Sequence, residues 1–276
     1  MKKLLPLFLA LCVALSLTAC GGPEKEEPAA EPVELFVFAA ASMTETMNQM
    51  IGMYRDVAPN VTITPTYDSS GTLLKQIKEG AECDLFISAA PKQINALDGS
   101  LKDDADKNPD GLDMILQGSR LDLLENKVTL VVPEGNPKGI ETFDQLAELL
   151  KSGSVMLAMG NGDVPVGQYT LKIFAYYGID ESAVSGNLTY GSNVKEVTTQ
   201  VSEGAVDCGI IYATDAFSAG LTVVDDATAG MCGQVIYPAA VLKDSRHPGE
   251  AQDFLDYLAG SDAGAVFTSV GFTALQ

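Results

Sequence analysis

The residues with the clearest chemical potential are serines that stand where an apolar run ends and a helical pattern begins. Phe36–Ala41 is an apolar, strand-like run, and Ser42 follows it, with Glu45 three residues later. This spacing predicts a helix whose N-cap is Ser42 and whose capping box is completed by Glu45. Such a helix start offers unpaired N–H groups, a positive dipole end and a hydroxyl, which suit a small anion. A plain structural cap is the simpler interpretation of one such serine.

The same arrangement occurs a second time. Tyr67 ends another β-favouring run, and Ser69-Ser70-Gly71-Thr72 follows before the next helical pattern. Two such turns at the carboxyl ends of neighbouring parallel strands would meet in the crevice where α/β proteins bind ligands. Ser70 or Thr72 could instead serve only as a cap.

Three later segments have related features. Gly160–Tyr169 contains glycines and a proline and leads into a helical pattern, so the backbone N–H of Val166 or Gly167 would be exposed there. Tyr190–Val194 also leads into a helical pattern, and the apolar run Cys208–Tyr212 ends in a phenol. Together with the two serine turns, these segments form a set of candidate hydrogen-bond donors.

The elements that would position these residues alternate along the chain. Strands are predicted for Leu35–Ala39, Val61–Tyr67, Leu85–Ala89, Val128–Val132, Val155–Met159, Cys208–Tyr212, Leu221–Val224 and Tyr237–Leu242. Helices are predicted for Thr44–Tyr54, Leu73–Glu79, Phe143–Leu150, Gln168–Tyr177, Val194–Glu203 and Gly249–Ala259. This alternation indicates an α/β protein with mainly parallel sheets. Gly118–Lys127 and Ala229–Pro238 are the places where the chain could cross between two lobes.

The first 32 residues read as a leader and a tether. Residues 1–19 combine a basic start with a short apolar run, which is the pattern of a signal peptide. Leu17-Thr18-Ala19-Cys20 resembles the bacterial lipobox, which implies cleavage before Cys20 and lipidation of its thiol. Residues 20–32 therefore predict a lipidated Cys20 and a disordered tether rich in Pro and Glu. We expect an extracytoplasmic protein that is lipid-anchored to the cell membrane.

Charge and cysteine content narrow the class of protein further. The formal net charge is −20, which argues against nucleic acid as a partner. Any bound anion must then be held by local dipoles against the overall field. Beyond the leader and Cys20, three cysteines remain without metal-ligand spacing, and buried free thiols are the expected state: Cys83, Cys208 and Cys232.

Two rival interpretations have weaker support in the residues. A serine hydrolase would need an oriented base, and the one histidine, His247, has no sequence link to Ser42 or Ser70. Asp106–Gly111, within the acidic insert 98–113, matches the opening of an EF-hand loop, but position twelve would be Gln117. We therefore expect neither an enzyme nor a metal-cation site, and no cofactor.

Six blocks in order resemble the molybdate-binding proteins of bacterial ABC transporters. They are Phe38–Thr44, Ser69–Ile77, Asp84–Ser88, Val164–Tyr169, Gly209–Tyr212 and Gly271–Thr273. The resemblance extends from about Val33 to the C-terminus. It implies a two-lobed periplasmic-binding-protein type II fold with two crossover strands, in which the oxyanion lies between the lobes. We place the first lobe at 33–120 and 236–276, and the second at 121–235.

The resemblance also implies a set of binding residues. Ser42 and Ser70 would each donate a hydroxyl and a backbone N–H, Val166 and Val194 a backbone N–H, and Tyr212 its phenol. None of these five residues is Arg or Lys, so the site would use neutral dipoles. A donor-only cage suits molybdate or tungstate, which carry no proton at neutral pH, whereas protonated phosphate would need an acceptor.

The chain departs from the family pattern at three places. The acidic insert 98–113 is long, Gly71 stands where a third hydroxyl is often found, and Asp68 and Asp163 lie close to binding loops. We expect both carboxylates to point away from a dianion. The expected partners are a molybdate or tungstate oxyanion and an ABC permease with its ATPase, with the protein itself a monomer. Sulfate as the ligand, and a signalling partner in place of a permease, remain alternatives.

Overall fold

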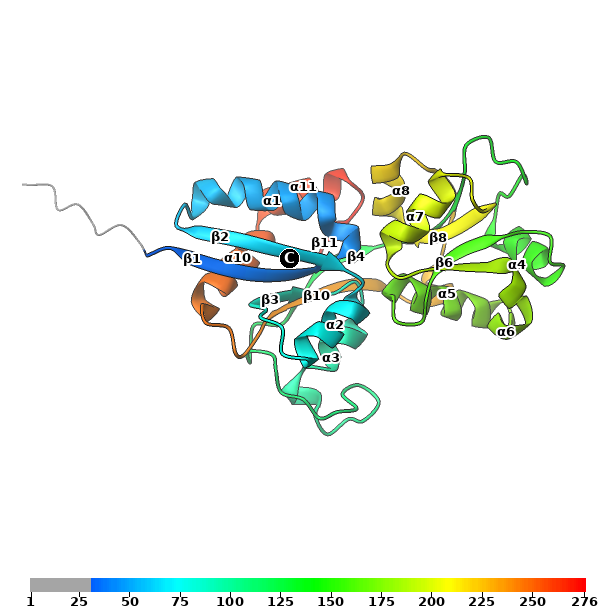
Figure 1. Ribbon diagram of the computed structural model, residues 1–276. Helices are drawn as coiled ribbons and strands as arrows, with labels where there is room; N and C mark the ends of the chain where they lie inside the picture. Colours follow the sequence, from blue (N-terminus) through cyan, green and yellow to red (C-terminus); the bar gives the residue numbers. More distant parts are fainter. Residues whose placement is uncertain (1–30) are drawn as a thin grey trace, which may run out of the picture. The chain divides into compact units, whose positions relative to one another are not determined.

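The structure is a computed structural model that describes residues 31–276 of the chain. The predictions for the signal peptide, for Cys20 and for nearly all of the tether therefore lie outside the described residues. The part from Pro32 to Gln276 is one compact unit. It contains two β-sheets with helices on their faces (Figure 1).

The first lobe is built on a sheet of six strands. The strands are β1 (Val33–Ala40), β2 (Val61–Asp68), β3 (Leu85–Ile87), β4 (Leu121–Asn126), β10 (Val235–Val241) and β11 (Thr273–Ala274), in the order β11-β4-β10-β3-β1-β2. Its helices are α1 (Thr44–Val57), α2 (Ser70–Lys78), α3 (Pro91–Asn95), α10 (Pro248–Leu258) and α11 (Ser261–Ser269), with short 3-10 helices η1 (Ala41–Met43) and η2 (Gly99–Leu101).

The second lobe is built on a sheet of five strands. The strands are β5 (Val128–Val132), β6 (Leu157–Gly160), β7 (Leu188–Gly191), β8 (Cys208–Tyr212) and β9 (Thr222–Asp226), in the order β7-β6-β8-β5-β9. Its helices are α4 (Phe143–Lys151), α5 (Pro165–Tyr176), α6 (Glu181–Val184), α7 (Val194–Ser202), α8 (Ala213–Ala219) and α9 (Ala229–Cys232), with the 3-10 helix η3 (Ser185–Asn187).

Side-chain alternation gives the first sheet two apolar faces. In β1, Val37 packs into the large core that also contains Met47 and Met50 of α1. The next residue, Phe38, packs into a second cluster with Leu73 and Ile77 of α2. Successive strand residues point to opposite faces. In Figure 1, α1 and α2 accordingly lie on opposite sides of this sheet.

Both sheets are mixed, whereas mainly parallel sheets were expected. β1 pairs in parallel with β2 and β3, and β6 with β7 and β8. The antiparallel pairs all involve strands at the two crossings or the C-terminal strand: β10 with β3 and β4, β11 with β4, and β5 with β8 and β9. The strand that returns to a sheet runs against the strand that left it, so a chain that crosses out and back produces mixed sheets. The α/β two-lobed fold itself is confirmed.

The crossings fall within the two segments that the sequence indicated. β4 belongs to the first sheet and β5 to the second, so the chain changes sheet at Lys127. The predicted boundary at 120/121 thus falls before β4, which pairs with β10 of the first sheet. The return crossing lies between α9 and β10, close to the predicted boundary at 235/236.

One further prediction concerns the cysteines. Cys83, Cys208 and Cys232 are free and buried, as expected. In the acidic insert, the Asn108 amide donates to the carbonyls of Asp98 and Leu112, and its oxygen accepts from Leu112 N–H. Asn108 therefore closes this loop through its own side chain.

Candidate functional site

A small cavity lies between the two lobes, where the first residues of three helices meet. These residues are Ser70 of α2, Pro165 of α5 and Val194 of α7. The full lining comprises Ala40, Ala41, Ser42, Asp68, Ser69, Ser70, Ala89, Val164, Pro165, Val194 and Tyr212. The space open to the centre of a water molecule is about 10 Å³, close to the minimum that one water needs. The positive dipole ends of three helices therefore meet at this cavity.

The structure brings the five predicted site residues together. Four of them line the cavity: Ser42, Ser70, Val194 and Tyr212. The fifth, Val166, is buried directly after the lining residue Pro165. That these residues bind an anion stays a prediction, which the geometry below makes specific.

Ser42 does not cap a helix, so the predicted capping box is wrong. It lies inside η1, and neither η1 nor α1 has a side-chain cap. The Glu45 side chain contacts Lys195 of the second lobe instead. The hydroxyl of Ser42 is instead hydrogen-bonded to the phenol of Tyr237, with 2.9 Å between the two oxygens.

Tyr237 and Asn126, which the sequence analysis missed, do not line the cavity but form a hydrogen-bond network with Ser42. Asn126 Nδ2 donates to the Tyr237 hydroxyl at 3.2 Å and to Thr214 Oγ1 at 2.9 Å. If the Tyr237 hydroxyl is the donor in its hydrogen bond with Ser42 Oγ, the Ser42 hydroxyl hydrogen can point into the cavity. A tyrosine within an apolar strand was the available signal, because a buried phenol needs a polar partner.

Ser70 also keeps a proton available for donation. Its oxygen accepts the N–H of Ala89 at 2.9 Å, and no described hydrogen bond uses its own proton. The cap of α2 is the neighbouring Ser69, whose Oγ accepts from Thr72 N–H at 3.1 Å. The two adjacent serines therefore divide the structural role and the candidate donor role between them.

Main-chain donors come from the starts of α5 and α7. Val166 is the second residue of α5 and Val194 the first of α7, so their N–H groups have no carbonyl within the helix to bond. Gly167 allows α5 to start here, because a Cβ at this position would lie 2.2 Å from the carbonyl oxygen of Asn161. Only glycine permits this approach of helix and loop.

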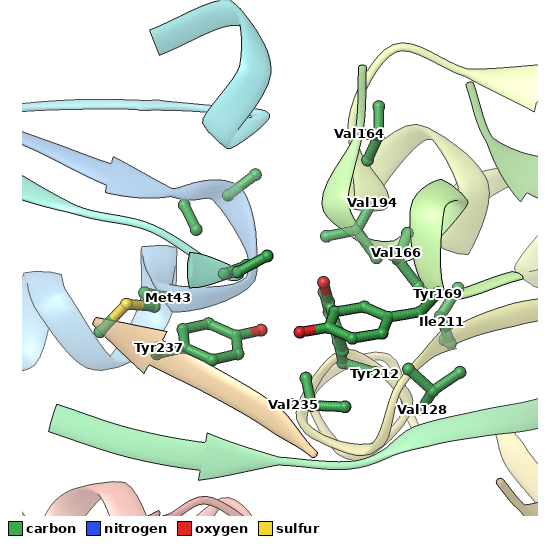
Figure 2. Packing of buried hydrophobic residues seen from close by; sticks show 14 of the residues in the cluster. Met43, Val128, Val164, Val166, Tyr169, Val194, Ile211, Tyr212, Val235 and Tyr237 are labelled. Carbon is green, nitrogen blue, oxygen red and sulfur yellow. The ribbon is translucent and has the colours of Figure 1, made fainter. Parts of the chain in front are cut away.

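Tyr212 carries a buried hydroxyl without a hydrogen-bond partner among the described residues. Its side chain ends β8, and its ring packs edge-on against those of Tyr169 and Tyr237. Figure 2 shows the hydroxyls of Tyr169 and Tyr237 turned toward one another, whereas the hydroxyl of Tyr212 points toward the side of the view where Val194 lies. Burial, with a smaller contribution from Tyr237, raises the pKa of Tyr212 well above its usual value. Tyr212 is therefore neutral and able to donate.

The two carboxylates near the binding loops behave differently. Asp163 is exposed and does not line the cavity, as expected. Asp68 is among the lining residues, and the orientation of its carboxylate away from a dianion stays a prediction. Its Oδ1 accepts from Ser69 N–H at 2.7 Å and from Asn193 Nδ2 at 3.4 Å. These donors hold the carboxylate at the place where the two lobes meet.

A buried ion pair lies beside the cavity. Asp215 Oδ1 is 3.2 Å from Lys195 Nζ, and the Asp215 side chain is fully buried. Burial raises the pKa of Asp215 to about 6, although Lys195 opposes this shift. Burial also acts to lower the pKa of Lys195, but Asp215 and Glu45 outweigh it and raise that pKa above its usual value. No Lys or Arg side chain lines the cavity itself.

His247 takes no part in this constellation. It stands at the start of α10, and its backbone N–H donates to Ser245 Oγ at 3.1 Å. No hydrogen bond within residues 31–276 joins it to Ser42 or Ser70. The same part of the chain holds no cluster of three or more metal-ligating side chains.

Comparison with known proteins gives a consistent picture of relatedness. A family model described as bacterial extracellular solute-binding protein matches residues 35–273. A Bacillus subtilis protein named as a candidate ABC transporter substrate-binding lipoprotein, YvgL, is 33% identical over 99% of this chain and 100% of its own length. The molybdate-binding protein ModA of Escherichia coli is 30% identical over 99% of this chain and 98% of its own length.

Two solved structures share the fold at lower identity. The periplasmic molybdate-binding protein of Azotobacter vinelandii has a TM-score of 0.71 at 19% identity, covering 88% of this chain and all of the other. The sulfate-binding protein SubI of Mycobacterium tuberculosis has a TM-score of 0.68 at 19% identity, covering 88% of each chain.

Proposed function

The chain belongs to the bacterial extracellular solute-binding proteins, and from this premise we propose that it captures molybdate, and also tungstate, in the cavity between its lobes. It is a substrate-binding protein of an ABC transporter, a class whose members capture a solute and work with a permease and its ATPase. Its relatives are solute-binding proteins rather than enzymes.

The observation that carries the proposal is the unpartnered hydroxyl of Tyr212. A buried polar group without a partner lowers stability by about 1–3 kcal/mol, so its presence at a cavity points to a ligand that accepts a hydrogen bond. The unused hydroxyl hydrogen of Ser70 and the first-turn N–H groups of α5 and α7 could donate to the same ligand. Every one of these groups is a donor, and none carries a formal charge.

A donor-only cage selects the protonation state of its ligand. Molybdate and tungstate carry no proton at neutral pH and accept hydrogen bonds through all four oxygens. Phosphate retains a proton at pH 7 and would need an acceptor, and Oδ1 of the one carboxylate residue in the lining, Asp68, already accepts from Ser69 N–H and Asn193 Nδ2. The E. coli relative named as molybdate-binding supports this choice of ligand.

Sulfate is the alternative ligand. It is also unprotonated and fits a donor-only cage, and it is smaller than molybdate, so the small size of the cavity favours it over molybdate. Asp68 would repel either dianion. The distinction therefore depends on the radius of the cage rather than on the kind of donor.

Capture would proceed by closure of the lobes. The anion first meets Ser42 and Ser70 on the first lobe, and Tyr212 and the starts of α5 and α7 then complete the cage. Closure excludes water and strengthens each hydrogen bond. The closed form, a monomer held near the membrane through lipidated Cys20, would then deliver the anion to its permease. The lipoprotein name of the B. subtilis relative supports the anchor, and no helix within residues 31–276 is long and apolar enough to cross a bilayer.

Isothermal calorimetry with molybdate, tungstate, sulfate and phosphate tests the proposal directly. We expect molybdate and tungstate to bind tightly and phosphate not to bind. Ser70→Ala should weaken molybdate binding by about tenfold or more, because it removes a hydrogen bond to a charged group. Ser152→Ala, on an exposed serine after α4, is the matched control and should leave binding unchanged. Tight binding of sulfate without molybdate would replace the assignment with the alternative.

A further inference from the structure

Lys195 stands between two carboxylates that belong to different lobes. Its Nζ lies 2.8 and 3.0 Å from the two carboxylate oxygens of Glu45, which is in the first turn of α1. The same Nζ lies 3.2 Å from Oδ1 of Asp215, which is in the first turn of α8. Lys195 itself follows Val194 at the start of α7. One ammonium group therefore connects the first lobe to the second beside the cavity.

The two carboxylates differ sharply in exposure. The Asp215 side chain is 0% exposed, whereas that of Glu45 is 54% exposed. Neither oxygen of Asp215 has a hydrogen bond among the described residues, so the Lys195 charge is what compensates it. A buried charge that loses its partner is strongly destabilising. The Lys195–Asp215 pair lies within the second lobe, so its formation does not depend on contact between the lobes.

The Glu45 contact is different because it crosses between the lobes. The Glu45 carboxylate can be solvated by water, so the protein does not need the contact with Lys195 in order to fold. Two other contacts cross the same boundary nearby. Asn193 Nδ2 donates to Asp68 Oδ1 at 3.4 Å, and a Cβ on Gly71 would lie 2.1 Å from the carbonyl oxygen of Asp163. The residues on either side of Val194 thus both reach across to the first lobe.

We infer that Lys195 is the latch of the closed form: it stays paired with Asp215 and takes up Glu45 as the lobes close over the ligand. This inference rests on the proposed function for the existence of a bound anion, but not on which anion it is. Lys195 is a positioning residue, since it lies outside the cavity lining. It would hold the start of α7, and with it the N–H of Val194, against the first lobe. The latch forms after encounter, so it should slow release without changing capture.

Glu45→Gln in the full chain is the cleanest test, because Glu45 is exposed and its loss leaves the Lys195–Asp215 pair intact. Stopped-flow tyrosine fluorescence with molybdate gives the two rate constants separately. We expect the release rate to rise about two- to fivefold, the range of a partly exposed ion pair, and the association rate to stay unchanged. Added salt should accelerate release from the wild type but much less from the variant, because only the wild type has the pair to screen.

The matched control is Asp56→Asn. Asp56 is an exposed acid on the same helix, α1, with no ion pair or hydrogen bond among the described contacts. It loses the same charge from the chain, so it should leave both rate constants unchanged. If it changed the release rate as much as Glu45→Gln does, net charge rather than a latch would be responsible, and the inference would be overturned.

A readout without molybdate separates this inference from the proposed function. If molybdate fails to bind, the same rates are measured with sulfate, and small-angle scattering compares the dimensions of the wild type and Glu45→Gln at saturation with the anion that binds and in its absence. A shift of the variant toward the open form would support the latch even though the molybdate assignment had failed. Unchanged release and unchanged dimensions would refute the latch even if molybdate binds tightly.

Discussion

Replacing Tyr212 by Phe should change the ligand-free and the liganded protein in opposite directions. The ring is buried between Tyr169 and Tyr237, and Phe preserves both edge-on contacts. The change removes only a hydroxyl that has no hydrogen-bond partner within the described residues. Tyr212→Phe therefore tests a single buried hydroxyl that the described contacts leave without a partner.

The expected magnitudes follow from the burial of this hydroxyl. Without a ligand, removing it relieves a penalty of about 1–3 kcal/mol. For a domain of this size, each kcal/mol corresponds to roughly 2–4 °C in Tm. With an oxyanion, the same change removes a hydrogen bond to a charged group, about 1.5–3 kcal/mol, so affinity should fall about ten- to hundredfold.

Thermal unfolding with and without molybdate measures both effects in one experiment. We expect Tyr212→Phe to have the higher Tm without ligand and the smaller rise in Tm with ligand. Tyr237→Phe is the matched control, because the Tyr237 hydroxyl has two partners, Ser42 and Asn126. Its loss should lower the Tm of the ligand-free protein. A lower Tm for ligand-free Tyr212→Phe, or an undiminished affinity, would refute the reasoning.

Three further predictions concern closure, pH and the thiols. Gly71→Ala should weaken anion binding at least tenfold, since its Cβ would meet the Asp163 carbonyl oxygen at 2.1 Å and oppose closure. Full affinity in calorimetry would contradict this. Because the pKa of Asp215 is about 6 in the folded protein against an ordinary 3.8, the folded state binds the proton more tightly. Stability should therefore fall as pH rises from 4 to 6, by roughly 2 kcal/mol relative to Asp215→Asn; parallel pH profiles of Tm for the two proteins would rule this out. The three described cysteines are Cys83, Cys208 and Cys232, and burial raises the pKa of each thiol. A disulfide reagent should therefore label them only after denaturation. Rapid labelling of the native protein would show that the thiols are not buried.

Local patterns were sufficient to locate most of the secondary structure. The bounds predicted for Val128–Val132 and Cys208–Tyr212 coincide with β5 and β8, because each is a short, strongly apolar run with clear ends. β4 was missed because Leu121–Asn126 mixes apolar and charged residues and owes its strand conformation to pairing with β10. α8 was missed as well, since Ala213–Ala219 has few residues and no strong periodicity.

The candidate site divides in the same way. The sequence by itself placed five candidate donors at the ends of strands and the starts of helices, because N-cap residues, glycines and apolar runs act on their immediate neighbours. Only the tertiary structure decided which of those groups is free to donate. Ser69, and not Ser70, caps α2. Ser42 caps no helix, because its hydroxyl is hydrogen-bonded to Tyr237, which lies 195 residues away in the sequence. A buried hydroxyl or N–H group forms its hydrogen bond with a polar group that lies within bonding distance. How the sheets and lobes pack decides which group that is, and the adjacent sequence does not.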